Sequence, residues 1–177
     1  MHIHWGKDSK GSEHLLQDTQ HALEMHLVNT YDDSGTTKYT VYARFFKEGA
    51  ENAYLKKMIT AQEATGASRD LTAFNLLALY PTSIDTVYTY EGSLTTPTCD
   101  ELVHWVVIPD VLEVSTAQLA SLRTLKLGSG SGAAKEYNWR EEQDLNSRNI
   151  TKYTSGGARV VFAPLLLVLA TFARMMF

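Results

Sequence analysis

Three histidines near the start of the chain have the type and spacing of a metal site. His2 and His4 stand two residues apart in a segment expected to be a strand, so their side chains leave the same face, about 7 Å apart along it. A third histidine, His26, lies in a second strand-like segment. Three neutral imidazoles that leave a fourth position to water are typical of a catalytic zinc site. Because the chain has six histidines, exposed or core histidines can also produce this pattern by chance.

Strand-like segments supply most of the framework that must position these histidines. Alternating or β-rich residues predict strands at 2–5, 24–29, 39–46 and 102–108, with shorter pieces near 88–90 and 111–114. Helical spacing from 53 to 66 predicts one helix, and a capping box from Ser115 to Gln118 begins a second. The Gly- and Ser-rich segment 127–132 is expected to be a surface loop within one domain.

Composition indicates an ordered globular chain without a nucleic-acid partner. With 177 residues, 44% hydrophobic and 20% charged, the chain can bury a core as one domain. The net charge of -4 and the lack of a Lys/Arg cluster argue against binding to phosphates, whereas a small neutral or anionic substrate stays open. The single cysteine, Cys99, allows no internal disulfide and can be an ordinary buried residue.

Five sequence blocks around the histidines resemble one enzyme family. The blocks are His2-Ile3-His4-Trp5-Gly6, Gly11-Ser12-Glu13-His14, Glu24-Met25-His26-Leu27-Val28, Tyr90-Glu91-Gly92-Ser93-Leu94-Thr95-Thr96-Pro97 followed by Val103 and Trp105, and Asn138-Trp139-Arg140 with Gln143. They are similar to the H-F-H-W-G, G-S-E-H, E-x-H-x-V, Y-x-G-S-L-T-T-P and N-x-R-x-x-Q segments of the α-carbonic anhydrases. Their number and order argue against coincidence.

The resemblance implies both a fold and an activity. The fold would be mainly β with peripheral helices, built on a twisted, mostly antiparallel central sheet, incomplete at the N-terminus, with zinc on the face of a central strand. The activity would be the reversible hydration of carbon dioxide to bicarbonate and a proton, catalysed by a lyase that uses Zn²⁺. The alternative is a catalytically silent carbonic anhydrase-related domain that binds a partner at the cell surface. Silent relatives usually lose a ligand histidine or the Thr/Glu pair, and this chain keeps them all. The blocks make a metal-free β domain a poor alternative.

The resemblance also assigns roles to individual residues. His2, His4 and His26 would hold the zinc, and Thr95 would orient the attacking oxygen while donating its hydroxyl hydrogen to Glu13. The residues that would support the ligands are Glu24, His14, Tyr90 and Asn138. The residues that would line the substrate site are Val28, Val41, Leu94, Thr95, Thr96, Val103 and Trp105. Without the resemblance, the two glutamates would be read as solvated carboxylates and the apolar residues as core.

The resemblance places the chain in the secreted or membrane-anchored animal branch, with part of the domain missing. Family domains are longer before the zinc strand, so we expect an incomplete gene product, with a carbonic anhydrase domain at 1–153 and weak zinc binding in this form. The segment 95–101 is similar to the branch in which the cysteine corresponding to Cys99 pairs with an N-terminal cysteine, which is absent here. The first six residues lack the features of a signal peptide.

The C-terminal segment 154–177 predicts attachment to a membrane. Residues 160–173 are uncharged but shorter than the roughly 20 residues of a spanning helix, and they contain Pro164. Small residues at Ser155-Gly156-Gly157 favour a GPI-attachment signal with Ser155 as the attachment site, ahead of a short transmembrane anchor or an added core helix. A glycosylation sequon begins at Asn149. We therefore expect a glycoprotein on the outer face of the plasma membrane, or a secreted one.

Overall fold

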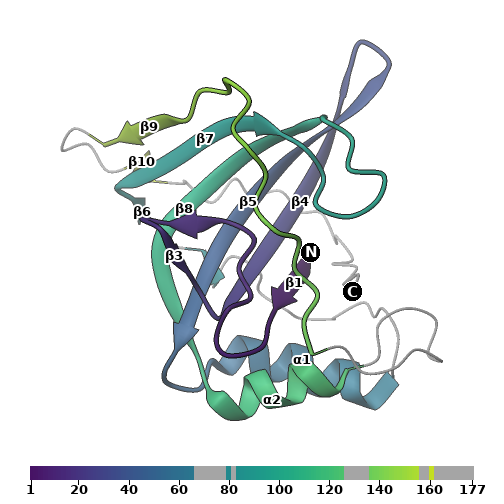
Figure 1. Ribbon diagram of the computed structural model, residues 1–177, viewed down its shortest axis with the longest axis vertical. Coiled ribbons are helices and arrows are strands. Elements are labelled where there is room, and N and C mark those ends of the chain that lie inside the picture. Colours follow the sequence, from purple (N-terminus) through teal and green to yellow (C-terminus); the bar gives the residue numbers. More distant parts are fainter. Residues whose placement is uncertain (66–78, 81–82, 126–135, 156–159, 162–177) are drawn as a thin grey trace.

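A computed structural model describes residues 1–65, 79–80, 83–125, 136–155 and 160–161, and strands dominate it (Figure 1). The strands, in chain order, are β1 (His2–Trp5), β2 (Leu15–Leu16), β3 (Thr19–Gln20), β4 (Leu23–Asp33), β5 (Thr36–Glu48), β6 (Ser83–Ile84), β7 (Thr86–Gly92), β8 (Val103–Val114), β9 (Thr151–Thr154) and β10 (Val160–Val161). The helices are α1 (Ala53–Thr65) and α2 (Thr116–Thr124). The predicted mainly β fold with peripheral helices is confirmed.

Six strands form one twisted sheet in the order β1-β4-β5-β8-β7-β9 (Figure 1). Every neighbouring pair in it is antiparallel except β5 and β8, which run parallel. The mostly antiparallel sheet is therefore confirmed. One expectation needs correction: within the described sheet β1 is an edge strand rather than a central one, because β4 alone pairs with it.

The two faces of the sheet bury different clusters of apolar side chains, because successive residues of a strand point to opposite faces. The helix-side cluster joins α1 and α2 to one face and includes Ile3, Trp5, Leu23, Met25, Phe46, Leu55, Met58, Leu119 and Leu122. The opposite face carries a second cluster made by Val41, Ala43, Phe45, Val103, Trp105 and Val107. The histidines of β1 and β4 alternate with the residues of the helix-side cluster, so they belong to the second face.

Polar side chains at the starts of the two helices bind each other. The predicted capping box is present: the Ser115 side chain accepts from the Gln118 backbone, and the Gln118 side chain accepts from Ser115 N at 3.1 Å. Gln118 also exchanges two hydrogen bonds with the Asn52 backbone, at 2.9 and 2.7 Å. The Asn52 carboxamide in turn accepts from the first turn of α1. These bonds fix α1 and α2 side by side, beneath one end of the sheet (Figure 1).

Several boundaries differ from the prediction. Strand β8 continues through Pro109 and Asp110 as a bulge, where the register on β5 skips from Ile108 to Val111; this is the kind of position at which a sheet tolerates proline. Strand β9 was not expected from the pattern, because all four of its residues are exposed and polar or aromatic. The predicted loop 127–132 and the apolar tail from 162 lie outside the described residues. No helix among the described residues has the length and apolar character needed to span a bilayer.

Candidate metal centre

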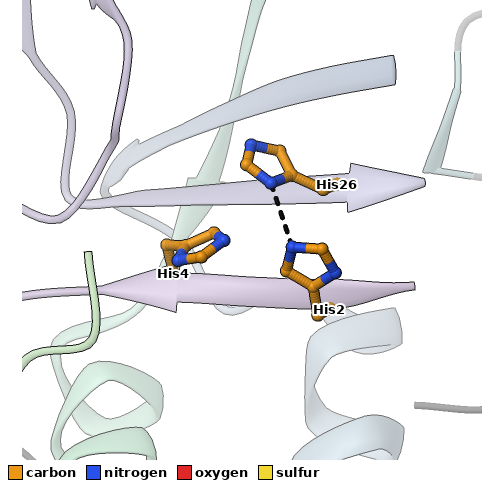
Figure 2. A group of neighbouring side chains, drawn as sticks. All are labelled: His2, His4 and His26. Atoms are coloured by element: carbon orange, nitrogen blue, oxygen red, sulfur yellow. Dashed lines mark hydrogen bonds between the residues drawn. The ribbon is translucent and has the colours of Figure 1, made fainter. Parts of the chain in front are cut away.

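The register of β1 on β4 brings the three predicted ligand histidines together. His2 lies directly opposite His26, and His4 lies opposite Glu24. Figure 2 shows the rings of His2 and His4 rising from β1 toward the ring of His26 on β4. The ring centroids are 4.7 to 5.0 Å apart, and one nitrogen of each ring lies within 4.8 Å of the other two. The group could therefore hold a metal ion.

Hydrogen bonds to the far side of two rings direct their other nitrogens into the cluster. His4 Nδ1 lies 2.9 Å from the Asn138 carbonyl, and His26 Nε2 lies 2.6 Å from Glu24 Oε1. Since both partners are acceptors, these nitrogens carry the hydrogens, and His4 Nε2 and His26 Nδ1 present lone pairs to the cluster. His26 Nδ1 lies 3.1 Å from His2 Nε2, so it accepts a hydrogen bond from that ring in the absence of a metal (Figure 2). Within the described residues His4 Nε2 is buried without a hydrogen-bond partner. A cation between the rings would supply that partner, so the donor set fits a metal such as zinc.

Burial keeps all three histidines in the neutral form that a metal requires. Burial is the main cause that lowers the pKa of His4 and of His26. The pKa of His2 falls to about 2, through burial first and then through the proximity of His26 and His4. Protons therefore compete poorly with a metal for these nitrogens at neutral pH.

Glu24 links the ligand His26 to a second histidine beneath it. The carboxylate is fully buried; its Oε1 lies 2.6 Å from both His26 Nε2 and His14 Nδ1. Its Oε2 accepts from the backbone N–H groups of Glu13 and His14, each at 2.9 Å. Burial alone would raise the pKa of Glu24, but its electrostatic interactions and hydrogen bonds with His14 and His26 hold it well below its usual range. His14 Nε2 then meets the Tyr90 hydroxyl at 2.6 Å, which completes a connected polar network.

Glu13 lies between the histidines and Thr95. Its Oε2 is 3.3 Å from His4 Nε2 and 3.9 Å from His26 Nδ1. The Thr95 hydroxyl hydrogen-bonds to the Glu13 carboxylate, and Glu13 Oε1 accepts from the Arg140 backbone at 2.8 Å. Burial raises the pKa of Glu13, whereas His26, Thr95 and Arg140 oppose the rise. The carboxylate is thus placed to accept the threonine hydrogen beside the candidate metal position.

Asn138 does more than the motif comparison assigned to it. Its backbone carbonyl accepts from His4, but its carboxamide also accepts from Trp5 N at 2.7 Å and donates to the Ile3 carbonyl at 2.9 Å. These bonds replace a neighbouring strand along the outer edge of β1. Sequence reasoning missed this role of Asn138 and the backbone donor of Arg140. The signal available was the side-chain type, since a carboxamide can accept from one backbone group and donate to another at the same time.

Most of the expected substrate wall lies on the histidine side of the sheet. Val41, Val103 and Trp105 are buried there, and the Trp105 ring centroid is 4.8 Å from that of His26. Val28 and Leu94 are partly buried against the same cluster. Thr96 is exposed.

The remaining predicted sites lie apart from the metal centre. Cys99 is a free, partly exposed thiol. Asn149 is exposed two residues before β9, and the Ser155 backbone donates to the Asp85 carbonyl at 2.9 Å just after that strand.

We expect the neutral histidines to make the metal-free fold sensitive to acid. Their pKa values are lowered in the folded chain, so below about 6.5 the unfolded chain binds more protons and stability falls. His14 and Glu13, whose pKa values are raised, oppose part of this change. With about two net protons, the free energy of unfolding should drop by about 2.7 kcal/mol per pH unit between pH 6 and 5. Urea unfolding of the metal-free chain at several pH values measures this slope, and constant or rising stability on acidification would contradict the expectation.

Comparison with known proteins agrees with this geometry. Residues 1–154 match the family described as eukaryotic-type carbonic anhydrase. The chain is 33% identical over 166 residues to carbonic anhydrase 3 of Homo sapiens, an alignment that covers 84% of this chain and 62% of that protein. It is 32% identical over 164 residues to carbonic anhydrase 6 of Bos taurus, covering 84% and 51%. It is 35% identical over 165 residues to carbonic anhydrase 1 of Oryctolagus cuniculus, covering 85% and 70%.

The chain therefore spans 51% to 70% of the length of these relatives. The family match extends over every residue of the candidate metal centre, from His2 on β1 to Asn138 beside it. The chain belongs to the eukaryotic-type carbonic anhydrase family.

Proposed function

We propose that the chain binds zinc through His2, His4 and His26 and catalyses the reversible hydration of carbon dioxide. The observation that carries the proposal is the convergence of three neutral imidazoles whose ligand nitrogens lie within 4.8 Å of one another. When bound, the zinc lowers the pKa of a coordinated water to about 7 and so provides a nucleophile at neutral pH. The family relationship supports this choice of metal and reaction.

The protein's own residues orient the reacting groups. The Glu13 carboxylate accepts the hydroxyl hydrogen of Thr95, so the threonine oxygen can accept a hydrogen bond from the attacking oxygen and fix its direction. The apolar side chains of Val41, Val103 and Trp105 form a wall that suits an uncharged, apolar substrate. A silent binding domain would have no need of the hydrogen bond between Thr95 and the buried Glu13 together with an intact ligand set.

Metal removal tests the proposal. Chelator treatment should abolish carbon dioxide hydration by the chain, and one equivalent of Zn²⁺ should restore it, since the zinc would provide the nucleophile. Stopped-flow hydration assays with metal analysis measure both effects. Binding of one zinc without any hydration above background would leave a metal site but overturn the enzymatic assignment.

We propose further that the protein is held at the outer cell surface. Support comes from the sequon at Asn149, whose side chain is exposed, and from the small residues that follow β9. Cleavage near Ser155 would keep β9 in the mature chain but remove β10.

Phosphatidylinositol-specific phospholipase should release the protein from intact cells, because the lipid would be its only link to the membrane. Immunoblotting of the medium and of the cell pellet measures the release, with a transmembrane surface protein as the control. Protein that stays in the pellet would favour a spanning segment.

A further inference from the structure

Arg44 is a buried cation on the face of the sheet opposite the three histidines. It stands on β5 between Met25 of β4 and Ile108 of β8, both fully buried and apolar. Only 4% of Arg44 is exposed. A guanidinium in such surroundings is strongly unfavourable unless acceptors reach its N–H groups.

Donors of Arg44 and of a neighbouring tyrosine lack acceptors. Among the residues that the structure describes, Arg44 Nε and Nη1 are buried without a hydrogen-bond partner, and so is the Tyr80 hydroxyl. The Tyr80 ring packs edge-on against Tyr42, which shares the strand face of Arg44, at 6.3 Å between centroids. The Arg44 charge also acts on Tyr80, where it opposes the rise in pKa that burial causes. Since native proteins pair more than roughly 90% of buried polar groups, three orphaned atoms in one place indicate a missing ligand.

The donors define the ligand's chemistry. A guanidinium offers hydrogens only, whereas a phenol can donate one hydrogen or accept one, so the ligand must provide acceptors and can carry at most one hydrogen, which the phenol oxygen can accept. The positive charge favours an anion over a water molecule, and close burial favours a small one. Asp110 is near enough to influence Arg44 electrostatically, yet the two side chains form no ion pair. The negative charge of Asp110 would repel a multiply charged anion more strongly than a monovalent one.

We propose that Arg44 and Tyr80 bind a small monovalent anion, chloride or bicarbonate, on the helix side of the sheet. This site is separate from the metal centre and does not depend on the proposed activity. Because the anion would complete the hydrogen bonds of a buried charge, it binds the folded chain and not the unfolded one. Its occupancy therefore stabilises the fold.

Equilibrium unfolding of the full chain in urea, titrated with sodium chloride or with sodium bicarbonate at pH 8, tests the site. Sodium gluconate, whose anion is too large, keeps the ionic strength constant. An anion at about ten times its Kd should raise the ratio of folded to unfolded chain about elevenfold. The ratio of folded to unfolded chain doubles when the anion concentration equals its Kd, so the anion that doubles it at the lower concentration is the preferred ligand. Sulfate should stabilise the fold no more than gluconate does.

Three variants assign the effect. Arg44→Met roughly keeps the side-chain volume but removes the charge, so the stability of this variant should no longer depend on the anion. Tyr80→Phe removes one hydrogen-bonding group and should raise the Kd of the anion several-fold. Lys47→Met is the matched control, because it removes a cation from the same strand whose side chain is 59% exposed, and it should keep the dependence. Anions that bind at the histidines act equally on wild type and Arg44→Met and cancel in the comparison. The proposal would be overturned if neither anion changed the stability of the wild type, or if Arg44→Met responded to the anion as strongly as the wild type does. Should Arg44→Met not fold, an unchanged response in Tyr80→Phe would overturn it.

Discussion

Replacing His26 with alanine is expected to remove nearly all bound zinc and, with it, carbon dioxide hydration. The imidazole supplies one of three ligand nitrogens, and its position is fixed by the fully buried Glu24. Two remaining histidines and water make an incomplete site, so zinc affinity should fall by at least about a thousandfold. Metal analysis after dialysis and a competitive chelator titration measure the loss.

The matched control is His104→Ala, because this histidine is partly exposed on β8 and contacts Glu91 rather than the metal centre. Its zinc content and hydration rate should equal those of the wild type. Circular dichroism of both variants separates ligand loss from unfolding. Unchanged zinc affinity in folded His26→Ala would exclude this ligand set.

Thr95→Ala is expected to slow hydration by about a hundredfold or more while leaving zinc content near one equivalent. The threonine hydroxyl binds the Glu13 carboxylate and, in the proposed mechanism, orients the attacking oxygen without acting as a zinc ligand. Loss of one oriented hydrogen-bonding group in an active site typically costs a factor of about 10² to 10³ in rate. Stopped-flow assays at matched zinc loading measure the effect.

The conservative variant Thr95→Ser keeps the hydroxyl and should recover most of the rate, which a purely packing role of the threonine methyl would not allow. Glu13→Gln should slow hydration about as much as Thr95→Ala does, because a carboxamide is uncharged and has one acceptor oxygen in place of two. Full activity in Thr95→Ala would show that the attacking oxygen is oriented by other groups.

The fold could be predicted where apolar and polar residues alternate along a strand or where a side chain caps a helix, and less well elsewhere. The capping box at Ser115 and the short strand around His4 follow from local rules, and both elements lie where they were expected. The sequence did not reveal strand β9, since a fully exposed edge strand leaves no pattern of buried residues. The passage of β8 through Pro109 was also missed, because a bulge depends on the register of the partner strand.

The candidate site shows the same division. Residue types and spacing pointed to the histidines, and the similarity to a known family pointed to Glu13 and Thr95. Neither could reveal that the Asn138 carboxamide binds the free edge of β1, because the two segments are more than 130 residues apart and meet only in the fold. Arg44 lies in a predicted strand, but its burial could not be predicted, because it depends on how other elements pack around β5.

Each ligand histidine of β1 is followed by a residue that enters the helix-side cluster: Ile3 after His2, and Trp5 after His4. A rigid strand of four residues cannot move one of its faces without the other. Substitutions that change side-chain volume in the helix-side cluster where α2 packs, for instance at Leu119, would therefore tilt the imidazoles. The substituted residues themselves lie away from the candidate metal position. Metal selectivity at the proposed site would consequently change with substitutions in the hydrophobic core on the far side of the sheet.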